Sequence, residues 1–244
     1  MVAKKKSSKQ VSKKKPAKKP QKPAPKQAKA KAKPAKQAKP IVVPTDPEAL
    51  TEFLDDAIYK LDRPRIEAAL AAGATIDPTD GSQSMLMIAC YAENKHTPKS
   101  VARAKLLLEL GADPTYRATQ EKNRTALHEL SFQPNLEILD ALLAKAKLEA
   151  SADDVGNTPM HYAATYCTDP TYFERLVALG NPVDSANGRG DRPIHSAIGN
   201  GNHKAIQWFV ARGASLDGTV DYAKNPSNYV ADKTLALLEK LGAK

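Results

Sequence analysis

The chain has 244 residues, of which 41% are hydrophobic and 26% charged, and its formal net charge at pH 7 is +10. This length allows one or two domains. No uninterrupted apolar run reaches the about 18 residues that a transmembrane helix needs, and the N-terminus lacks the apolar core of a secretory signal peptide. We therefore expect a cytoplasmic or nuclear (or nucleoid) protein, with no transmembrane segment and no classical route of secretion.

The positive charge is concentrated at the N-terminal end. Residues 1–40 hold 16 of the 37 basic residues, all of them Lys, and contain no Asp or Glu. The other 21 basic residues are outnumbered by 27 acidic ones, so a tail of charge +16 precedes a body of charge −6. A segment rich in Lys, Ala and Pro cannot bury enough apolar surface to offset the cost of ordering its backbone. The composition predicts a disordered Lys/Pro/Ala-rich tail over residues 1–45.

The tail has three alternative roles. Because Lys residues release counterions from phosphates, a flexible Lys-rich segment is expected to bind DNA or RNA with little sequence preference. The tail resembles those of linker histones, and one Lys cluster resembles a nuclear localisation signal. This cluster consists of Lys13, Lys14, Lys15, Lys18 and Lys19. The same charge would attract an anionic membrane, although no amphipathic helix assists it. The third alternative is a solubilising extension.

After the tail, the chain is organised in repeats. Residues from about 47 to 78 predict a capping pair of helices. The tripeptide Ala-Leu-His at 126–128 then returns as Pro-Met-His at 159–161 and as Pro-Ile-His at 193–195, after 33 and 34 residues. Self-similarity at this period indicates stacked helix-turn-helix units. The predicted units span about 79–119, 120–152, 153–186 and 187–219, and a C-terminal cap spans about 220–244.

Local signals support the helices of each unit. Thr158 is a natural N-cap, and Pro159 follows it at the first helical position, where its missing N–H does no harm. A glycine follows the apolar run of several predicted helices and suits a left-handed helix cap. These glycines are Gly73, Gly111, Gly180 and Gly213. Trp208 and Phe209 lie at helical spacing from other apolar residues, and we predict that both belong to the core.

The repeated residues resemble the ankyrin repeat, whose pattern is Gly-x-Thr-Pro-Leu-His-x-Ala followed by Leu-Leu and Gly-Ala-Asp. The closest matches are Gly-Asn-Thr-Pro-Met-His-Tyr-Ala at 156–163 and Leu-Leu-Leu-Glu-Leu-Gly-Ala-Asp at 106–113. The resemblance covers about residues 47–244, so we assign 46–244 to an ankyrin-repeat domain. It implies an all-α fold, a solenoid of stacked helix-turn-helix units with short hairpin loops, preceded by the disordered basic tail.

Three departures from the ankyrin pattern are informative. Met87 replaces His in the first full repeat, which also has an insertion at residues 93–100 that should lengthen the break between its helices. The next repeat ends in Ala146-Lys147, where Gly-Ala is expected. Arg192 occupies the Thr position of the fourth repeat, and we expect it to weaken that helix cap.

The recurring histidines do not predict a metal site. Zinc requires ligand atoms within about 2.0–2.3 Å of one ion, whereas equivalent positions on packed helices lie roughly 8–10 Å apart. The resemblance implies instead that each His bonds backbone between repeats. The sequence shows no catalytic constellation, and Cys90 and Cys167 are expected to be reduced thiols. We expect no metal, no cofactor and no enzymatic activity.

The resemblance places partner contacts near the end of the first helix of each repeat and in the polar hairpin slots. The candidate partner-binding residues are Tyr91, Glu121, Lys122, Asp154, Asn157, Thr165, Tyr166, Arg189 and Asp191. For any one of them, the alternative is a merely solvated position.

Two functional hypotheses follow. In the first, the chain is a monomeric, non-enzymatic adaptor that binds a protein through its repeats while the tail binds nucleic acid or directs the chain to the nucleus. In the second, it is an effector or inhibitor that is delivered into a foreign cell and binds a host protein.

The adaptor hypothesis makes a testable prediction about salt. Deleting residues 1–45 should remove most of the affinity for random-sequence duplex DNA, and the slope of log affinity against log salt should lose about 0.9 for each phosphate that the tail neutralises. Fluorescence anisotropy with labelled DNA at several salt concentrations measures both quantities. If the shortened chain binds DNA equally well with an unchanged slope, the tail is not the nucleic-acid site.

Overall fold

The computed structural model describes residues 40–91, 95–228 and 230–244. The predicted disorder of residues 1–39 and the cluster Lys13–Lys19 lie outside the described residues, as do residues 93 and 94 of the predicted insertion. Residues 41–244 form one compact unit. Over the described ranges this unit consists of α-helices, two short 3₁₀ helices and loops, with no β-strand. The predicted all-α class is confirmed.

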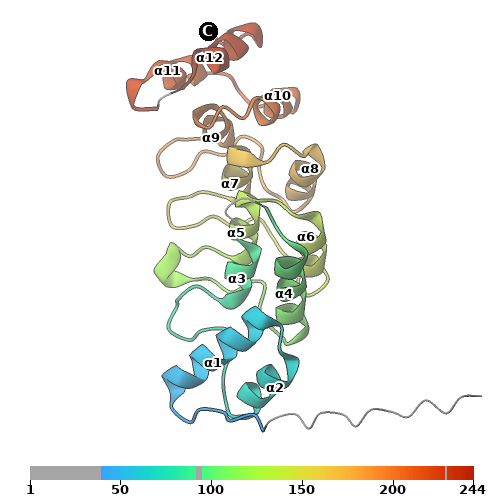
Figure 1. Cartoon of the computed structure of the whole chain (residues 1–244). Helices are drawn as coiled ribbons and strands as arrows, with labels where there is room; N and C mark the ends of the chain where they lie inside the picture. Colours follow the sequence, from blue (N-terminus) through green and yellow to red (C-terminus); the bar gives the residue numbers. More distant parts are fainter. Residues whose placement is uncertain (1–39, 92–94, 229) are drawn as a thin grey trace, which may run out of the picture. The chain divides into compact units, whose positions relative to one another are not determined.

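The helices follow one another in pairs (Figure 1). They are α1 (Pro47–Lys60) with α2 (Arg63–Ala71), α3 (Met85–Cys90) with α4 (Pro98–Glu109), α5 (Ala126–Phe132) with α6 (Leu136–Leu143), α7 (Pro159–Tyr166) with α8 (Pro170–Ala178), α9 (Pro193–Gly199) with α10 (His203–Ala211), and α11 (Thr219–Lys224) with α12 (Asp232–Lys240). The 3₁₀ helices are η1 (Thr119–Glu121) and η2 (Pro226–Asn228). The first helices of the middle four pairs, α3, α5, α7 and α9, pack in a row and are called the inner helices below. Loops project on one side of this row, and α4, α6, α8 and α10 lie on the other side.

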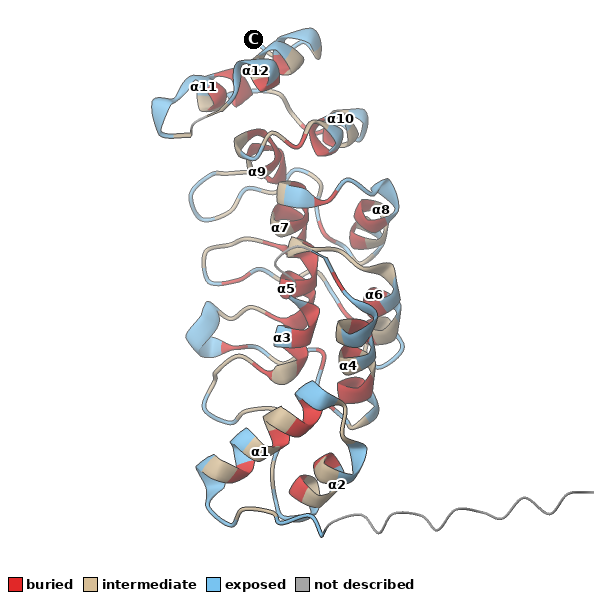
Figure 2. Ribbon diagram, viewed as in Figure 1, coloured by how far each residue is buried: buried red, intermediate tan, exposed pale blue. Residues whose placement is uncertain are grey.

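The core lies between the inner helices and their second helices (Figure 2). Each pair contributes fully buried apolar side chains, such as Leu107 from α4 and Leu130 from α5. Phe209 is fully buried, as predicted, whereas Trp208 is only half-buried. Adjacent helical residues point about 100° apart, so both cannot face the core. The Trp208 ring stacks on Phe173 with centroids 4.7 Å apart.

The second helices of the pairs end in the glycine pattern, with one exception. Gly73, Gly111, Gly180 and Gly213 have φ values of 99°, 98°, 84° and 83°, which confirms the predicted left-handed caps. The residue after such a glycine closes the helix end, as when the Ala112 N–H donates to the Leu107 carbonyl at 3.0 Å.

Helix α6 is the exception, because Ala146 and Lys147 stand where Gly-Ala is expected. No residue between 144 and 148 has positive φ. The Ala146 N–H donates to the Leu142 carbonyl at 3.2 Å and so adds a turn that continues the helical course. The chain therefore leaves α6 along a different path from that of the other second helices.

The recurring His closes the N-terminus of an inner helix. The backbone N–H of Thr125 donates to Nδ1 of His128 at 3.1 Å, and that of Thr158 donates to Nδ1 of His161 at the same distance. In the fourth repeat the backbone N–H of Arg192 makes the same bond to His195 at 3.1 Å. A nitrogen that accepts here carries no proton, so the bond requires a neutral ring with its hydrogen on Nε2.

The prediction that each His bonds backbone in the next repeat is confirmed for His161 alone. Its Nε2 lies 3.1 Å from the carbonyl of Asp191. Nε2 of His128 is buried and forms no hydrogen bond within the described part of the chain. The His195 ring stacks on Tyr222 of α11, with centroids 4.6 Å apart and planes 10° apart. Here the prediction is wrong because the unit that follows is α11 and α12, which covers the ring face.

Arg192 contacts the loop that follows its own repeat. It lacks the hydroxyl that Thr offers to a helix N-terminus, but its guanidinium donates to the carbonyls of Ser215 at 3.0 Å and Asp217 at 2.6 Å. It also pairs with the Asp184 carboxylate at 3.3 Å. The residue thus loses a local cap contact and gains contacts to neighbouring loops.

The buried histidines make stability depend on pH. Burial lowers the pKa of His128, His161 and His195 from the usual 6.5, and that of His128 to about 4. At a pH between the pKa of a His in the folded chain and its pKa in the unfolded chain, the unfolded chain binds a proton that the folded chain does not. The stabilisation from the neutral rings is therefore complete above about pH 6.5 and is lost as the pH falls toward the folded pKa.

We predict that the free energy of unfolding contributed by His128 falls by about 2 kcal/mol between pH 7.5 and pH 5. The variant His128→Gln should lose correspondingly less stability over this range than the wild type. Urea unfolding at pH 7.5, 6 and 5 measures the difference. The control is His203→Gln, which removes a half-buried His that caps no inner helix. Identical pH slopes for wild type and His128→Gln would contradict the role given to the neutral ring.

Candidate partner-binding surface

The loops that precede α7 and α9 are closed by Asx side chains. Oδ1 of Asp153 accepts hydrogen bonds from the N–H groups of Val155 at 2.9 Å and Asn157 at 2.8 Å. One repeat later, Oδ1 of Asn187 accepts from Arg189 at 2.9 Å and from Asp191 at 3.0 Å. A side chain that mimics a backbone turn in this way fixes the loop without a ladder of strand hydrogen bonds.

Neighbouring loops are bonded to one another through their backbones. The N–H of Asp154 donates to the carbonyl of Lys122 at 2.9 Å, and the N–H of Gly188 donates to the carbonyl of Val155 at 2.7 Å. The approach is close at Gly156, where φ is 86° and a Cβ would lie 2.7 Å from the nitrogen of Gly188. These loops therefore form a continuous layer along the inner helices.

The candidate loop residues fall into two groups. Three have side chains engaged within the fold: Glu121 pairs with Arg124 at 3.0 Å, Asp154 accepts from Asn123 at 2.6 Å, and Asn157 accepts from Asn187 at 2.8 Å.

Lys122 and Arg189 form the second group, since both are exposed and neither forms an ion pair within the described ranges. Asp191 belongs to neither group: it is half-buried, and its carboxylate is 3.8 Å from Nδ1 of His195. The structure thus leaves two cationic side chains available at the loop surface.

The candidate aromatic residues belong to a larger apolar surface. Tyr91 and Tyr166 are 43% and 56% exposed, and Ile88 is 46% exposed. The Phe132 ring contacts Tyr91 on one side, with centroids 5.9 Å apart, and Tyr162 on the other, at 4.6 Å. We call the set Ile88, Tyr91, Phe132, Tyr162 and Tyr166 the inner-helix strip. Thr165 lies beside Tyr166, and its hydroxyl is 3.4 Å from the His161 carbonyl, so it is partly engaged in its own helix.

The sequence interpretation named two of the five strip residues and missed Ile88, Phe132 and Tyr162. A signal for them was present. Ile88 and Tyr162 directly follow the His position of their repeats, and Phe132 lies four residues after His128. Positions one and four after the same residue are three apart on a helix and share a face. Aligning the repeats on His gives this signal only in part, because Glu129 and Ser196 share the column of Ile88 and Tyr162, and Gly199 shares the column of Phe132.

Tyr162 links the strip to the loop layer. Its hydroxyl donates to the Asp153 carboxylate at 2.5 Å. Burial tends to raise the pKa of Asp153, but this bond and those from two backbone N–H groups prevail and hold the pKa below its usual value. Burial and the Asp153 carboxylate raise the pKa of Tyr162. The pair fixes the direction of the Tyr162 ring on the strip.

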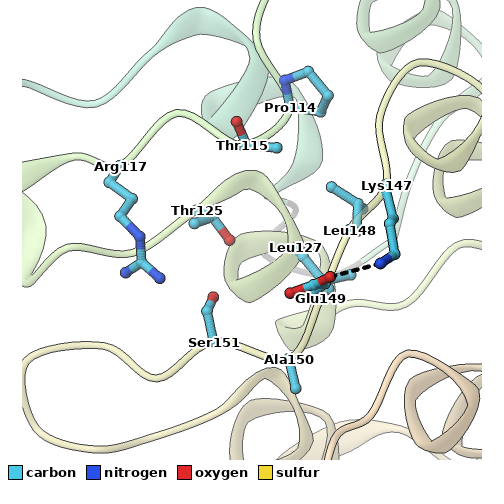
Figure 3. Close-up of a pocket in the computed structure, with 10 residues that line it drawn as sticks. All are labelled: Pro114, Thr115, Arg117, Thr125, Leu127, Lys147, Leu148, Glu149, Ala150 and Ser151. Atoms are coloured by element: carbon cyan, nitrogen blue, oxygen red, sulfur yellow. Dashed lines mark ion pairs between the residues drawn. The ribbon is translucent and has the colours of Figure 1, made fainter.

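A pocket of about 360 Å³ lies between residues 114–117 and 147–151 (Figure 3). The Arg117 guanidinium and the hydroxyls of Thr125 and Ser151 are on one side, and the ion pair of Lys147 with Glu149, at 2.9 Å, is on the other. The pocket borders the segment that follows α6, where the left-handed cap is missing. Its position reflects this irregular helix end, and none of the candidate binding residues lines it.

Other potentially reactive groups are dispersed. In the part of the chain that the structure describes, no three His, Cys, Asp or Glu side chains are grouped so as to hold a metal ion. Cys90 and Cys167 are free and buried, and burial raises the pKa of the Cys167 thiol to about 11. No described helix has the length and apolar character needed to cross a bilayer.

Comparison with known families gives a match near the C-terminal end of the chain. A family model described as ankyrin repeats (many copies) matches residues 168–210. This segment holds α8, α9 and α10, and its helix pairs have the same architecture as those before it. The fold is an ankyrin-repeat solenoid. Among curated proteins, no sequence matches the chain. Ankyrin repeats are protein-interaction modules and imply that this chain binds protein partners.

The contact between the strip and the ankyrin loop layer can be tested with Tyr162→Phe. Without the hydroxyl, the pKa of Asp153 should rise toward or above its unfolded value, which removes stabilisation that is present at neutral pH. Leaving this buried carboxylate without one donor should lower the free energy of unfolding by about 1–3 kcal/mol. NMR titration of Asp153 and urea unfolding at pH 7 measure the two effects.

The matched control is Tyr166→Phe, which removes a hydroxyl from an exposed ring on the same helix. It should leave stability unchanged. If both variants are as stable as the wild type, the Tyr162–Asp153 bond contributes nothing to the fold.

Proposed function

We propose that the inner-helix strip binds a segment of a protein partner. The observation that supports the proposal is a contiguous apolar surface that runs over α3, α5 and α7, on which three of the five side chains are more than 40% exposed. A contiguous exposed apolar patch rimmed by polar groups is a feature of interaction sites. Tyr side chains make effective anchors because they bury a large area with few rotatable bonds.

The loop layer supplies the polar rim of this surface. Glu121, Asp154 and Asn157 hold the loops in place through their bonds within the fold, so their contribution to binding is to shape the rim. Lys122 and Arg189 are exposed and can pair with acidic groups of a partner. Charged residues at a rim act mainly on the rate and specificity of association.

In this proposal the chain is a non-enzymatic, monomeric adaptor, and its Lys-rich tail adds a second attachment. The support for the tail's role is its charge of +16, which favours binding to nucleic acid or nuclear import. Two linked sites raise the effective concentration of each at its target when both targets are close together. An effector delivered into a foreign cell would use the same strip. The effector alternative therefore differs from the adaptor proposal in which cell contains the partner protein.

Truncating the two most exposed Tyr residues of the strip should abolish partner binding. We predict that proteins retained by the wild-type full-length chain in affinity purification are depleted at least about tenfold with Tyr91→Ser/Tyr166→Ser, because anchor residues carry most of the binding energy. Quantitative mass spectrometry of the purified fractions measures this. Both residues are exposed, so the double variant should remain folded.

Tyr59→Ser is the control. Tyr59 is 61% exposed but lies on α1 and is not part of the strip; the guanidinium of Arg103 lies 4.3 Å from the centre of its ring. It should retain the same proteins as the wild type. Retention of the same set by the double variant would mean that the strip is not the binding surface.

A further inference from the structure

A groove opens at the N-terminal end of the strip, between α1 and the start of α3. It has a volume of about 310 Å³. Its apolar lining comes from Ile76, Met85 and Ile88, and its charged lining from Asp55 and Asp80. We call it the N-terminal groove. Among the residues that the structure describes, no Lys or Arg side chain lines it, and the charged groups in its lining are both acidic.

The two carboxylates of the groove differ in their hydrogen bonding. Asp80 accepts a hydrogen bond from the Ser82 N–H at 2.8 Å, and this bond lowers its pKa. Asp55 is half-buried, and no hydrogen bond or ion pair reaches its carboxylate from the residues that the structure describes. Burial, followed by repulsion from Glu52, raises the pKa of Asp55. A cation in the groove would stabilise the ionised form of Asp55 and so oppose both effects on its pKa.

The neighbouring acid on α1 shows what Asp55 lacks. Asp56 pairs with Lys60 at 2.7 Å and with Arg65 at 2.6 Å, and these contacts lower its pKa. Asp55, one residue earlier, faces the groove instead of these cations. The groove thus contains a partly desolvated carboxylate that has no cationic partner within residues 40–91, 95–228 and 230–244.

The groove is continuous with the strip. Ile88 lines the groove and also belongs to the strip, three residues before Tyr91 on the same face of the inner-helix row. A chain segment whose apolar side chains cover Tyr91 and Phe132 would therefore bring its neighbouring residue to the groove. That residue would meet an apolar wall and a carboxylate, which together suit a side chain with an aliphatic stem and a cationic head.

We propose that the N-terminal groove binds a Lys or Arg side chain of the partner segment that lies on the inner-helix strip. The partner motif is then a basic residue followed at short spacing by apolar or aromatic residues. The proposal rests on the proposed function of the strip and adds to it the charge and the direction of the bound segment.

The test uses the full-length chain and a displayed library of random 12-residue peptides. Peptides selected on the wild type, with counter-selection on Tyr91→Ser/Tyr166→Ser, are synthesised with a fluorescent label, and their affinities are measured by anisotropy. We expect the selected peptides to share a Lys or Arg next to apolar residues. Asp55→Asn in the protein, or Lys→Gln in the peptide, should each weaken binding about tenfold, and the double change should cost little more than either alone.

The control is Glu67→Gln, which removes the same charge from an exposed position on α2 outside the groove, and which should leave affinity unchanged. Asp55→Asn should be at least as stable as the wild type because it removes a partly buried, repelled carboxylate, so a loss of affinity would not reflect unfolding.

The outcomes separate the two proposals. If peptides require Tyr91 and Tyr166 but bind Asp55→Asn as well as the wild type, the strip is confirmed and the basic-residue site is overturned. If Asp55→Asn and Glu67→Gln weaken binding equally, the effect is one of net charge, and the groove is again overturned. If selection enriches no peptide over the double Tyr variant, the proposed function fails, and this inference fails with it.

Discussion

The arrangement of this molecule depends on a contact that recurs at the start of three of the four inner helices, α5, α7 and α9: the bond from a backbone N–H to Nδ1 of the His three residues later. The bond fixes where the helix begins, and burial of the ring fixes how the helix is rotated about its axis. Phe132 lies four residues after His128 and Tyr162 lies one residue after His161. Positions one and four after the same residue are three apart on a helix and share a face. In α5 and α7 the cap that begins the helix therefore also places a ring of the candidate binding surface.

The polar loop residues show how one layer serves both folding and recognition. Asp153 and Asn187 close their loops, while Asn157 and Asp154 join each loop to the next. Because these groups are satisfied within the protein, the loops are presented in a defined conformation, which reduces the ordering cost of binding. The side chains left free at the rim are cationic, whereas the free charge in the groove at the end of the strip is anionic. A partner is thus discriminated by where along the surface its charges fall.

The repeat period, the Thr-Pro pairs and the glycines were sufficient to predict the helix pairs and the left-handed caps, because these depend on local conformational preference. The contacts between units were harder to predict from the sequence. Nε2 of His161 has a backbone partner, whereas that of His128 has none among the described residues. This difference depends on how closely two loops approach, which varies from repeat to repeat. The half-buried position of Trp208 depends on its rotation relative to Phe209. Of the strip residues, Tyr91 and Tyr166 were candidates from the family pattern, but the ring contacts through Phe132 arise only when three helices are packed side by side.

The irregular end of α6 has a consequence for how the stack moves. In a solenoid each unit is stabilised by its neighbours, so a boundary with an open gap contributes less interface energy and separates blocks that open independently. The pocket beside residues 147–151 lies at such a boundary, between residues 114–117, which follow α4, and the unit of α5 and α6. The Tyr91–Phe132 ring contact joins α3 to α5 across the same boundary. A segment lying over these two rings would contact both units at once, so occupancy of the strip would make the opening of the two units more cooperative.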